Sequence, residues 1–146
     1  MMTISTILFV CTGNTCRSPM AEGLAQKWLD EHQCDNWLAI SAGVFALDGM
    51  PTSEETLVTL AQRDIAFEGS STPFTKEMAQ SATIVFCMSN SHLAVAKQFT
   101  EHAELLDQEG DIADPIGQDQ SVYDALAMHM EPLIARRLES LTHQGA

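Results

Sequence analysis

The chain has 146 residues, 45% of them hydrophobic, and a net charge of −13 that results from 20 acidic and 7 basic residues. This length suits one domain with its own hydrophobic core, and we expect a single domain over residues 1–146. The shortage of basic residues argues against a nucleic-acid-binding surface, so we expect no nucleic-acid partner.

The N-terminal segment is apolar but short. It lacks the basic start of a signal peptide and the length of a membrane span, so we expect a cytoplasmic protein that does not bind membranes. Residues 3–10, TISTILFV, predict a buried strand. A helix is expected to follow through about His32, with Ser18 as N-cap and Pro19 as its first helical residue.

The rest of the chain continues to alternate strands with helices. Three apolar segments predict strands: residues 37–43, 82–88 and 103–107. Three amphipathic segments predict helices: residues 53–64, 91–99 and 121–141. Thr52 and Glu55 have the spacing of a capping box at the first of these helices. This alternation predicts an α/β sandwich, with a parallel sheet and helices on both of its faces.

The segment CTGNTCRS, residues 11–18, follows the first predicted strand. In parallel sheets, sites form at the carboxyl ends of the strands, where this segment lies. A loop with five residues between Cys11 and Arg17 can wrap around one tetrahedral anion with its backbone N–H groups. Arg17 can clamp two oxygens of that anion, and the same donors would stabilise a Cys11 thiolate. The segment therefore predicts phosphoryl transfer to cysteine.

Three further residues suit this loop. Gly13 permits unusual backbone angles, and Asn14 tolerates the left-handed region, so both fit a tightly curled loop. Ser18 can donate its hydroxyl to the Cys11 thiolate. The alternative is an ordinary turn beside a buried cysteine, which we disfavour because strand, loop and helix start occur together.

A leaving group also needs a proton donor. Asp114, in the segment DIADPIGQ before the last helix, is our candidate, although Asp-Pro followed by Gly is also a common turn. Asp111 and Asp119 are alternatives in the same region.

No metal site or cofactor is expected. Four cysteines without a CxxC pair suit reduced thiols in a cytosolic chain. Four histidines show no ligand spacing, and we interpret them as surface or helix-face residues: His92, His102, His129 and His143.

The motifs together resemble those of the low-molecular-weight protein tyrosine phosphatases. VCTGNTCRSPMAEG resembles the family's phosphate loop, while ISAGV and DPIG match two further segments in the expected order. The resemblance implies a four-stranded parallel sheet, a metal-free reaction and a phosphorylated protein as substrate. It implies Cys11 as nucleophile, Arg17 as phosphate clamp and Asp114 as general acid.

The resemblance also assigns supporting and substrate-binding residues. It implies that hydrogen bonds from Asn14, Ser18 and Ser41 hold the loop in shape. The substrate phosphate would contact the loop itself, whose remaining members are Thr12, Gly13, Thr15 and Cys16. Cys16 could form a reversible disulfide with Cys11, or simply fill space. We expect a monomer.

The family has several branches. Thr15, SAGVFA (residues 41–46) and SSTPFTKEM resemble bacterial protein-arginine phosphatases, in which a threonine hydroxyl suits a guanidinium group. A tyrosine phosphatase is the alternative; Phe45 or Trp37 would then supply an aromatic wall. Arsenate reductases need two more cysteines, and none follows Cys87. A phosphate-binding module without turnover is disfavoured, because all three catalytic residues are present.

Overall fold

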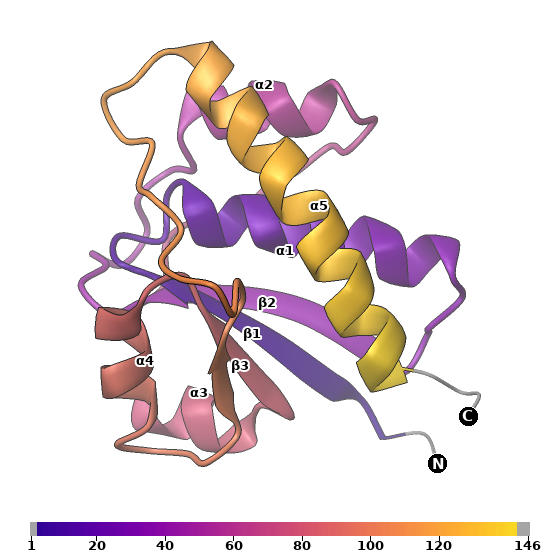
Figure 1. Ribbon diagram of the computed structural model, residues 1–146, viewed down its shortest axis with the longest axis vertical. Helices are drawn as coiled ribbons and strands as arrows, with labels where there is room; N and C mark the ends of the chain where they lie inside the picture. Colours follow the sequence, from indigo (N-terminus) through magenta and orange to yellow (C-terminus); the bar gives the residue numbers. More distant parts are fainter. Residues whose placement is uncertain (1–2, 143–146) are drawn as a thin grey trace.

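The computed structural model describes residues 3–142 and builds them into one parallel sheet with helices (Figure 1). The strands are β1 (Ser5–Cys11), β2 (Trp37–Gly43), β3 (Ile84–Cys87) and β4 (Ala103–Leu105). The helices are α1 (Arg17–Glu31), α2 (Glu54–Ala61), α3 (Lys76–Ser81), α4 (Asn90–Ala96) and α5 (Gln120–Thr142).

All four strands run parallel, in the order β2-β1-β3-β4. Helices α1 and α5 cover one face of the sheet, with α2 packed against both of them, and α3 and α4 lie on the other face (Figure 1). The predicted three-layer α/β architecture is therefore confirmed. Because β1 lies in the interior of the sheet, its carboxyl end at Cys11 is flanked by Gly43 of β2 and by the end of β3.

Two hydrophobic cores lie on opposite faces of β1. Ile7 and Phe9 pack with α1 and α5 in one core, while Leu8 and Val10 pack in the other with β3 and α4. All four side chains are fully buried. Successive side chains of a strand point to opposite faces, so a strand covered on both sides reads as a continuous apolar run.

Two predicted helix starts are wrong. Helix α1 begins at Arg17, so Ser18 lies inside the helix and is not its N-cap. The Ser18 hydroxyl contacts Cys11 and Asn14 instead of a free backbone N–H. Helix α2 takes Ser53 as its N-cap rather than Thr52, since the Ser53 oxygen accepts from the Thr56 N–H.

Helix α3 was not expected from the sequence. It is only six residues long, too short to show a helical period, and it is capped by Thr75, whose hydroxyl accepts from the Met78 N–H.

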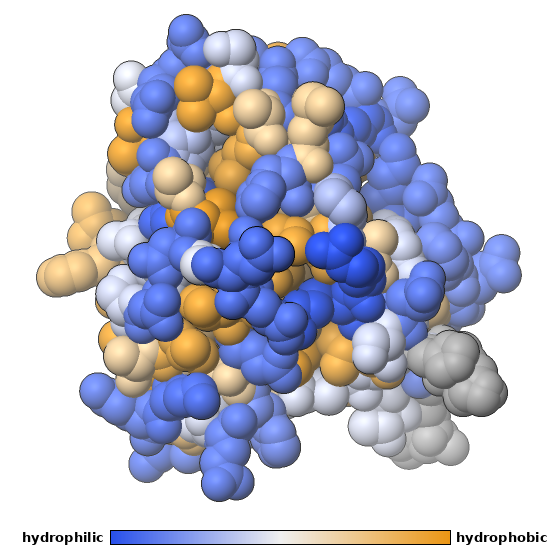
Figure 2. Space-filling view, in the orientation of Figure 1, coloured by the Kyte–Doolittle hydropathy of each residue, from blue (hydrophilic) through white to orange (hydrophobic). Residues whose placement is uncertain are grey.

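Polar side chains cover most of the surface that Figure 2 shows. The face crossed by α5 is mostly hydrophilic, with small apolar areas between the polar side chains (Figure 2). Within residues 3–142, no helix combines the length and the apolar character needed to cross a bilayer.

Gly43, at the end of β2, lets the loop after β1 approach closely. A Cβ atom at this position would lie 2.4 Å from the Thr12 carbonyl oxygen and 2.9 Å from the Asn14 nitrogen. Both neighbours are backbone atoms, which cannot rotate away as a side chain could. This close approach allows two hydrogen bonds between the segments, in which the backbone N–H groups of Val44 and Phe45 donate to the carbonyls of Cys11 and Thr12.

We predict that Gly43→Ala lowers the free energy of unfolding by about 2 kcal/mol, the cost of forcing a methyl group into a filled space. Denaturant unfolding monitored by circular dichroism measures this. Gly13→Ala is the matched control, because the nearest atom to a Cβ there is 3.8 Å away. Equal stability of the two variants would contradict the prediction.

Candidate active site

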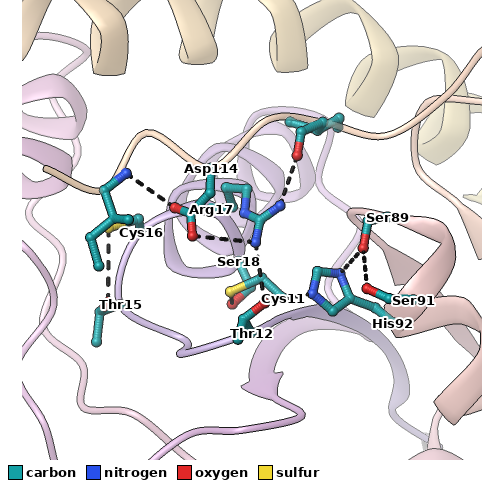
Figure 3. Close-up of polar contacts among 12 residues, drawn as sticks. Cys11, Thr12, Thr15, Cys16, Arg17, Ser18, Ser89, Ser91, His92 and Asp114 are labelled. Carbon is teal, nitrogen blue, oxygen red and sulfur yellow. Dashed lines mark hydrogen bonds and ion pairs between the residues drawn. The ribbon is translucent and has the colours of Figure 1, made fainter. Parts of the chain in front are cut away.

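The Cys11 side chain lies at the base of the loop between β1 and α1, only 2% exposed. Its sulfur is 2.9 Å from the Ser18 hydroxyl oxygen (Figure 3). The Asn14 backbone N–H also donates to it, over 3.3 Å. Both groups can donate to the sulfur, and the expected stabilisation of a Cys11 thiolate stays a prediction.

Asn14 holds the loop in its curled shape. Its φ angle of 59° is left-handed, so the unusual backbone conformation falls on Asn14 and not on Gly13. Its side-chain oxygen accepts from the Thr72 N–H at 2.8 Å. This fixes the amide orientation, because a backbone N–H can only donate. The amide nitrogen then donates to the hydroxyls of Ser18 (2.7 Å) and Ser41 (3.0 Å).

The same network orients the Ser18 hydroxyl toward the sulfur. Since Asn14 donates to the Ser18 oxygen, the hydroxyl hydrogen is left to donate elsewhere. The Cys11 sulfur is 2.9 Å away and the Ala42 carbonyl is 3.4 Å away. The structure thus brings together all three residues predicted to support the loop, namely Asn14, Ser18 and Ser41.

Arg17 places a buried positive charge beside the loop. It is 6% exposed, and one of its terminal nitrogens donates to the Ile112 carbonyl at 2.7 Å. The other nitrogen lies 3.4 Å from the Thr12 hydroxyl and 3.6 Å from an Asp114 carboxylate oxygen (Figure 3). Such an arginine can bind an oxyanion held by the loop.

Of the three candidate acids, only Asp114 lies at this site. Its carboxylate accepts from the Ile116 N–H, and its side chain is 40% exposed. Asp111 instead accepts from the backbone and side chain of Asn90 at the start of α4. Asp119 accepts from the Ser121 hydroxyl in the first turn of α5.

The other predicted contact residues surround the loop. Thr12 is exposed and Thr15 is half-buried. The Cys16 sulfur lies 3.4 Å from the Tyr123 hydroxyl, and Cys16 is free, so its disulfide with Cys11 stays a prediction. Phe45 is 85% exposed, and its backbone is tied to the Thr12 carbonyl at the edge of the site.

Trp37 does not lie at the site, so the suggestion that it could form an aromatic wall is wrong. It begins β2 and pairs with Ser5, whereas Cys11 pairs with Gly43 at the opposite end of the strand.

Cys87 lies at the end of β3, and its side chain is fully buried. Burial raises the pKa of its thiol to about 12, so it stays protonated at neutral pH.

His92 was expected on the surface or on a helix face, and it lies on the buried face of α4. The side chain is 2% exposed and lies 2.8 Å from the Thr12 hydroxyl. His102 and His129 are exposed as predicted, and His143 lies outside the described residues. Within residues 3–142, no three His, Cys, Asp or Glu side chains are grouped to hold a metal ion.

Glu22 of α1 extends the loop network and was not foreseen from the sequence. Its carboxylate accepts from the Ser41 hydroxyl at 2.6 Å, which links it through Asn14 and Ser18 to Cys11. Burial raises the Glu22 pKa, and the Ser41 hydrogen bond opposes that shift only in part.

We predict that Glu22→Gln stabilises the protein at pH 7 and not at pH 4. Because the pKa of Glu22 is raised in the folded state, ionising this carboxyl group destabilises the fold. The protein therefore loses stability as the pH rises from the ordinary pKa of 4.5 through the folded-state pKa. Thermal unfolding at both pH values measures this. Glu31→Gln, on the exposed end of the same helix, controls for removing one negative charge. An equal gain in both variants would contradict the prediction.

A family model, related sequences and solved structures all point to one protein family. Residues 6–146 match the family described as low molecular weight phosphotyrosine protein phosphatase. The chain is 39% identical to a protein-arginine-phosphatase of Geobacillus stearothermophilus, over 92% of this chain and 95% of the relative. It is 34% identical to the low molecular weight protein-tyrosine-phosphatase PtpB of Staphylococcus aureus, over 80% and 85%.

A solved structure is similar throughout. It is that of the arginine phosphatase YwlE, in a variant with a phosphorylated active-site serine. The TM-score is 0.88 at 29% identity, and the match covers 96% of this chain and 97% of that one.

Proposed function

Because the chain belongs to the low molecular weight phosphotyrosine protein phosphatase family, and is thus a hydrolase of phosphorylated protein residues, we propose that it dephosphorylates phosphoarginine through a phosphocysteine intermediate. One observation carries the proposal. A buried cysteine sulfur, a buried guanidinium and a carboxylate meet around a loop shaped for one tetrahedral anion: Cys11, Arg17 and Asp114.

In the first step, the Cys11 thiolate attacks phosphorus and the bond from phosphorus to the guanidinium nitrogen breaks. Asp114 gives its proton to that nitrogen, so that the arginine side chain leaves as a guanidinium cation. Arg17 and the loop N–H groups hold the phosphoryl oxygens. In the second step, Asp114 takes a proton from a water molecule that attacks the phosphocysteine, which releases phosphate and the Cys11 thiolate.

Arginine is proposed as the phosphorylated residue for two reasons. Thr15 offers a hydroxyl in the loop, which can hydrogen-bond to a donor-rich guanidinium group. The relatives that are named arginine phosphatases are 34% and 39% identical, over 92% of this chain. Phe45 donates its backbone N–H to the Thr12 carbonyl, and Ile116 donates its own to Asp114. Their exposed side chains can pack against the stem of the substrate side chain.

Phosphotyrosine is the second candidate substrate. Its support is the similarity to PtpB and the exposed ring of Phe45, against which a tyrosine ring can pack. Arsenate reduction is disfavoured, because Cys87 is buried and protonated and no cysteine follows it.

The remaining proposals concern the setting of the enzyme. We infer one phosphatase domain over residues 1–146, acting as a monomer in the cytoplasm, without nucleic-acid or membrane partners. The net charge of −13 supports protein substrates whose phosphorylated residues lie in basic segments.

The proposal predicts faster hydrolysis of a phosphoarginine peptide than of the same peptide with phosphotyrosine, each assayed alone with reductant present. Thr15→Ile is expected to lose or invert this preference by at least about tenfold, because it removes the hydroxyl. Phosphate release measures both. Preference for phosphotyrosine by the wild type would overturn the arginine assignment. Cys11→Ser must be inactive, and a wild type that is inactive on both peptides would overturn the proposed function.

We predict that Asp114→Asn lowers kcat by about a hundredfold or more, since an amide cannot donate the proton that the leaving group needs. Asp119→Asn is the matched control, because the Asp119 side chain accepts from Ser121 at the start of α5 and not from a residue of the site. Steady-state kinetics with the phosphoarginine peptide measure both variants. A larger loss of kcat in Asp119→Asn than in Asp114→Asn would show that Asp114 is not the general acid.

A further inference from the structure

His92 is a buried imidazole next to the loop that has no part in the reaction proposed above. It lies on α4, eighty residues after Thr12, on the opposite face of the sheet from α1. Its two ring nitrogens both have partners. One is 2.8 Å from the Thr12 hydroxyl and the other 2.9 Å from the Ser89 hydroxyl (Figure 3).

The partners of Thr12 favour one direction for these hydrogen bonds. Arg17 can only donate, so the Thr12 oxygen accepts from it. The Thr12 hydroxyl hydrogen is then free to point to His92 Nε2, which accepts it in the arrangement that we consider. A neutral imidazole with an accepting Nε2 carries its hydrogen on Nδ1, which donates to Ser89. Ser89 has a further hydroxyl partner in Ser91, at 2.9 Å.

His92 is neutral in this arrangement. Burial is the largest cause that lowers its pKa, and the nearby Arg17 guanidinium lowers it further. The carboxylates of Asp111 and Asp114 act in the opposite direction, and the net pKa is about 4. The imidazole therefore stays uncharged at neutral pH and remains able to accept from Thr12.

We propose that His92 is a positioning residue for the phosphate clamp: neutral His92 accepts from the Thr12 hydroxyl, which leaves the Thr12 oxygen to accept from Arg17 and so fixes the guanidinium. The proposal rests on the proposed function of the site. Without His92, the Thr12 hydroxyl can rotate its hydrogen toward Arg17, where a donor would face a donor. Arg17 would then keep only the Ile112 carbonyl and Asp114 as partners near the site.

The tautomer of His92 tests the hydrogen-bond direction without any assay of activity. In ¹⁵N-labelled protein at pH 7, long-range ¹H–¹⁵N spectra are expected to show His92 protonated on Nδ1 and not on Nε2. Thr12→Val, which removes the donor to Nε2, is expected to shift it toward the Nε2-protonated form. His102, exposed before β4, is the internal reference for an imidazole in water. Protonation on Nε2 in the wild type would overturn the proposal.

A double-mutant cycle tests the functional coupling. His92→Leu is expected to lower kcat/KM about tenfold, as for a lost hydrogen bond that supports a charged group. His92→Gln, whose amide oxygen can accept from Thr12, is expected to restore most of the loss. In a Thr12→Val background, His92→Leu is expected to have no further effect. Additive losses, or no recovery with Gln, would mean that His92 only fills space.

Binding of inorganic phosphate separates this proposal from the proposed function. If the wild type turns over neither peptide, the same cycle is measured on the dissociation constant for inorganic phosphate. Coupling of His92 and Thr12 in that constant would support the positioning role even though the catalytic proposal had failed. Additivity there would reject the positioning role. His102→Gln is the control, with wild-type phosphate binding and turnover expected.

Discussion

The left-handed backbone of Asn14 is the constraint on which the site depends. This conformation brings the Asn14 N–H to the Cys11 sulfur, while the Asn14 side chain bonds to neighbouring segments. There the amide joins Ser18, Ser41 and Thr72, which come from three different segments of the chain. Each hydrogen bond is worth about 1 kcal/mol net, so the loop shape rests on several weak bonds acting together.

The sheet supplies the place for this loop. Because β1 pairs in parallel with both β2 and β3, the loops after all three strands meet at one edge. Gly43 of β2 allows close approach from one side, and α4, which follows β3, brings His92 from the other. The Cys11 sulfur therefore lies where three separate segments can each contribute a contact.

Charge at the site is opposite in sign to that of the whole chain. Arg17 is buried beside the loop, whereas the net charge of the chain is −13. At long range, the acidic surface disfavours an anionic substrate. Salt at about 0.1 M screens this repulsion at separations greater than about 10 Å. At contact distance, Arg17 and the loop N–H groups dominate, so binding is governed by the local donors.

The sequence predicted the sheet and the position of the Cys11 to Arg17 loop at its edge, because both depend on local patterns. Buried strands show as apolar runs, and the Cys11 to Arg17 spacing is contained in one loop. Ser18 was placed in the site correctly, yet its expected role as N-cap was wrong. Its hydroxyl is used by Asn14 and Cys11, which periodicity does not reveal.

His92 and Glu22 could not be predicted, because their roles arise from tertiary contacts. His92 meets Thr12 only after β1 and β3 have paired, and one histidine in a short helix gives no periodic signal. Glu22 is a single acid on α1, and its link to Ser41 spans nineteen residues. A search for polar residues on the elements that flank the loop would have brought both into consideration.

The central claim is that this enzyme prefers phosphoarginine to phosphotyrosine. The most direct measurement is an internal competition, in which equal concentrations of the two phosphopeptides, identical in the rest of their sequence, are mixed with the wild-type enzyme. The ratio of their initial rates of loss equals the ratio of their kcat/KM values. We predict faster loss of phosphoarginine, with Cys11→Ser leaving both peptides intact. Faster loss of phosphotyrosine would contradict the claim.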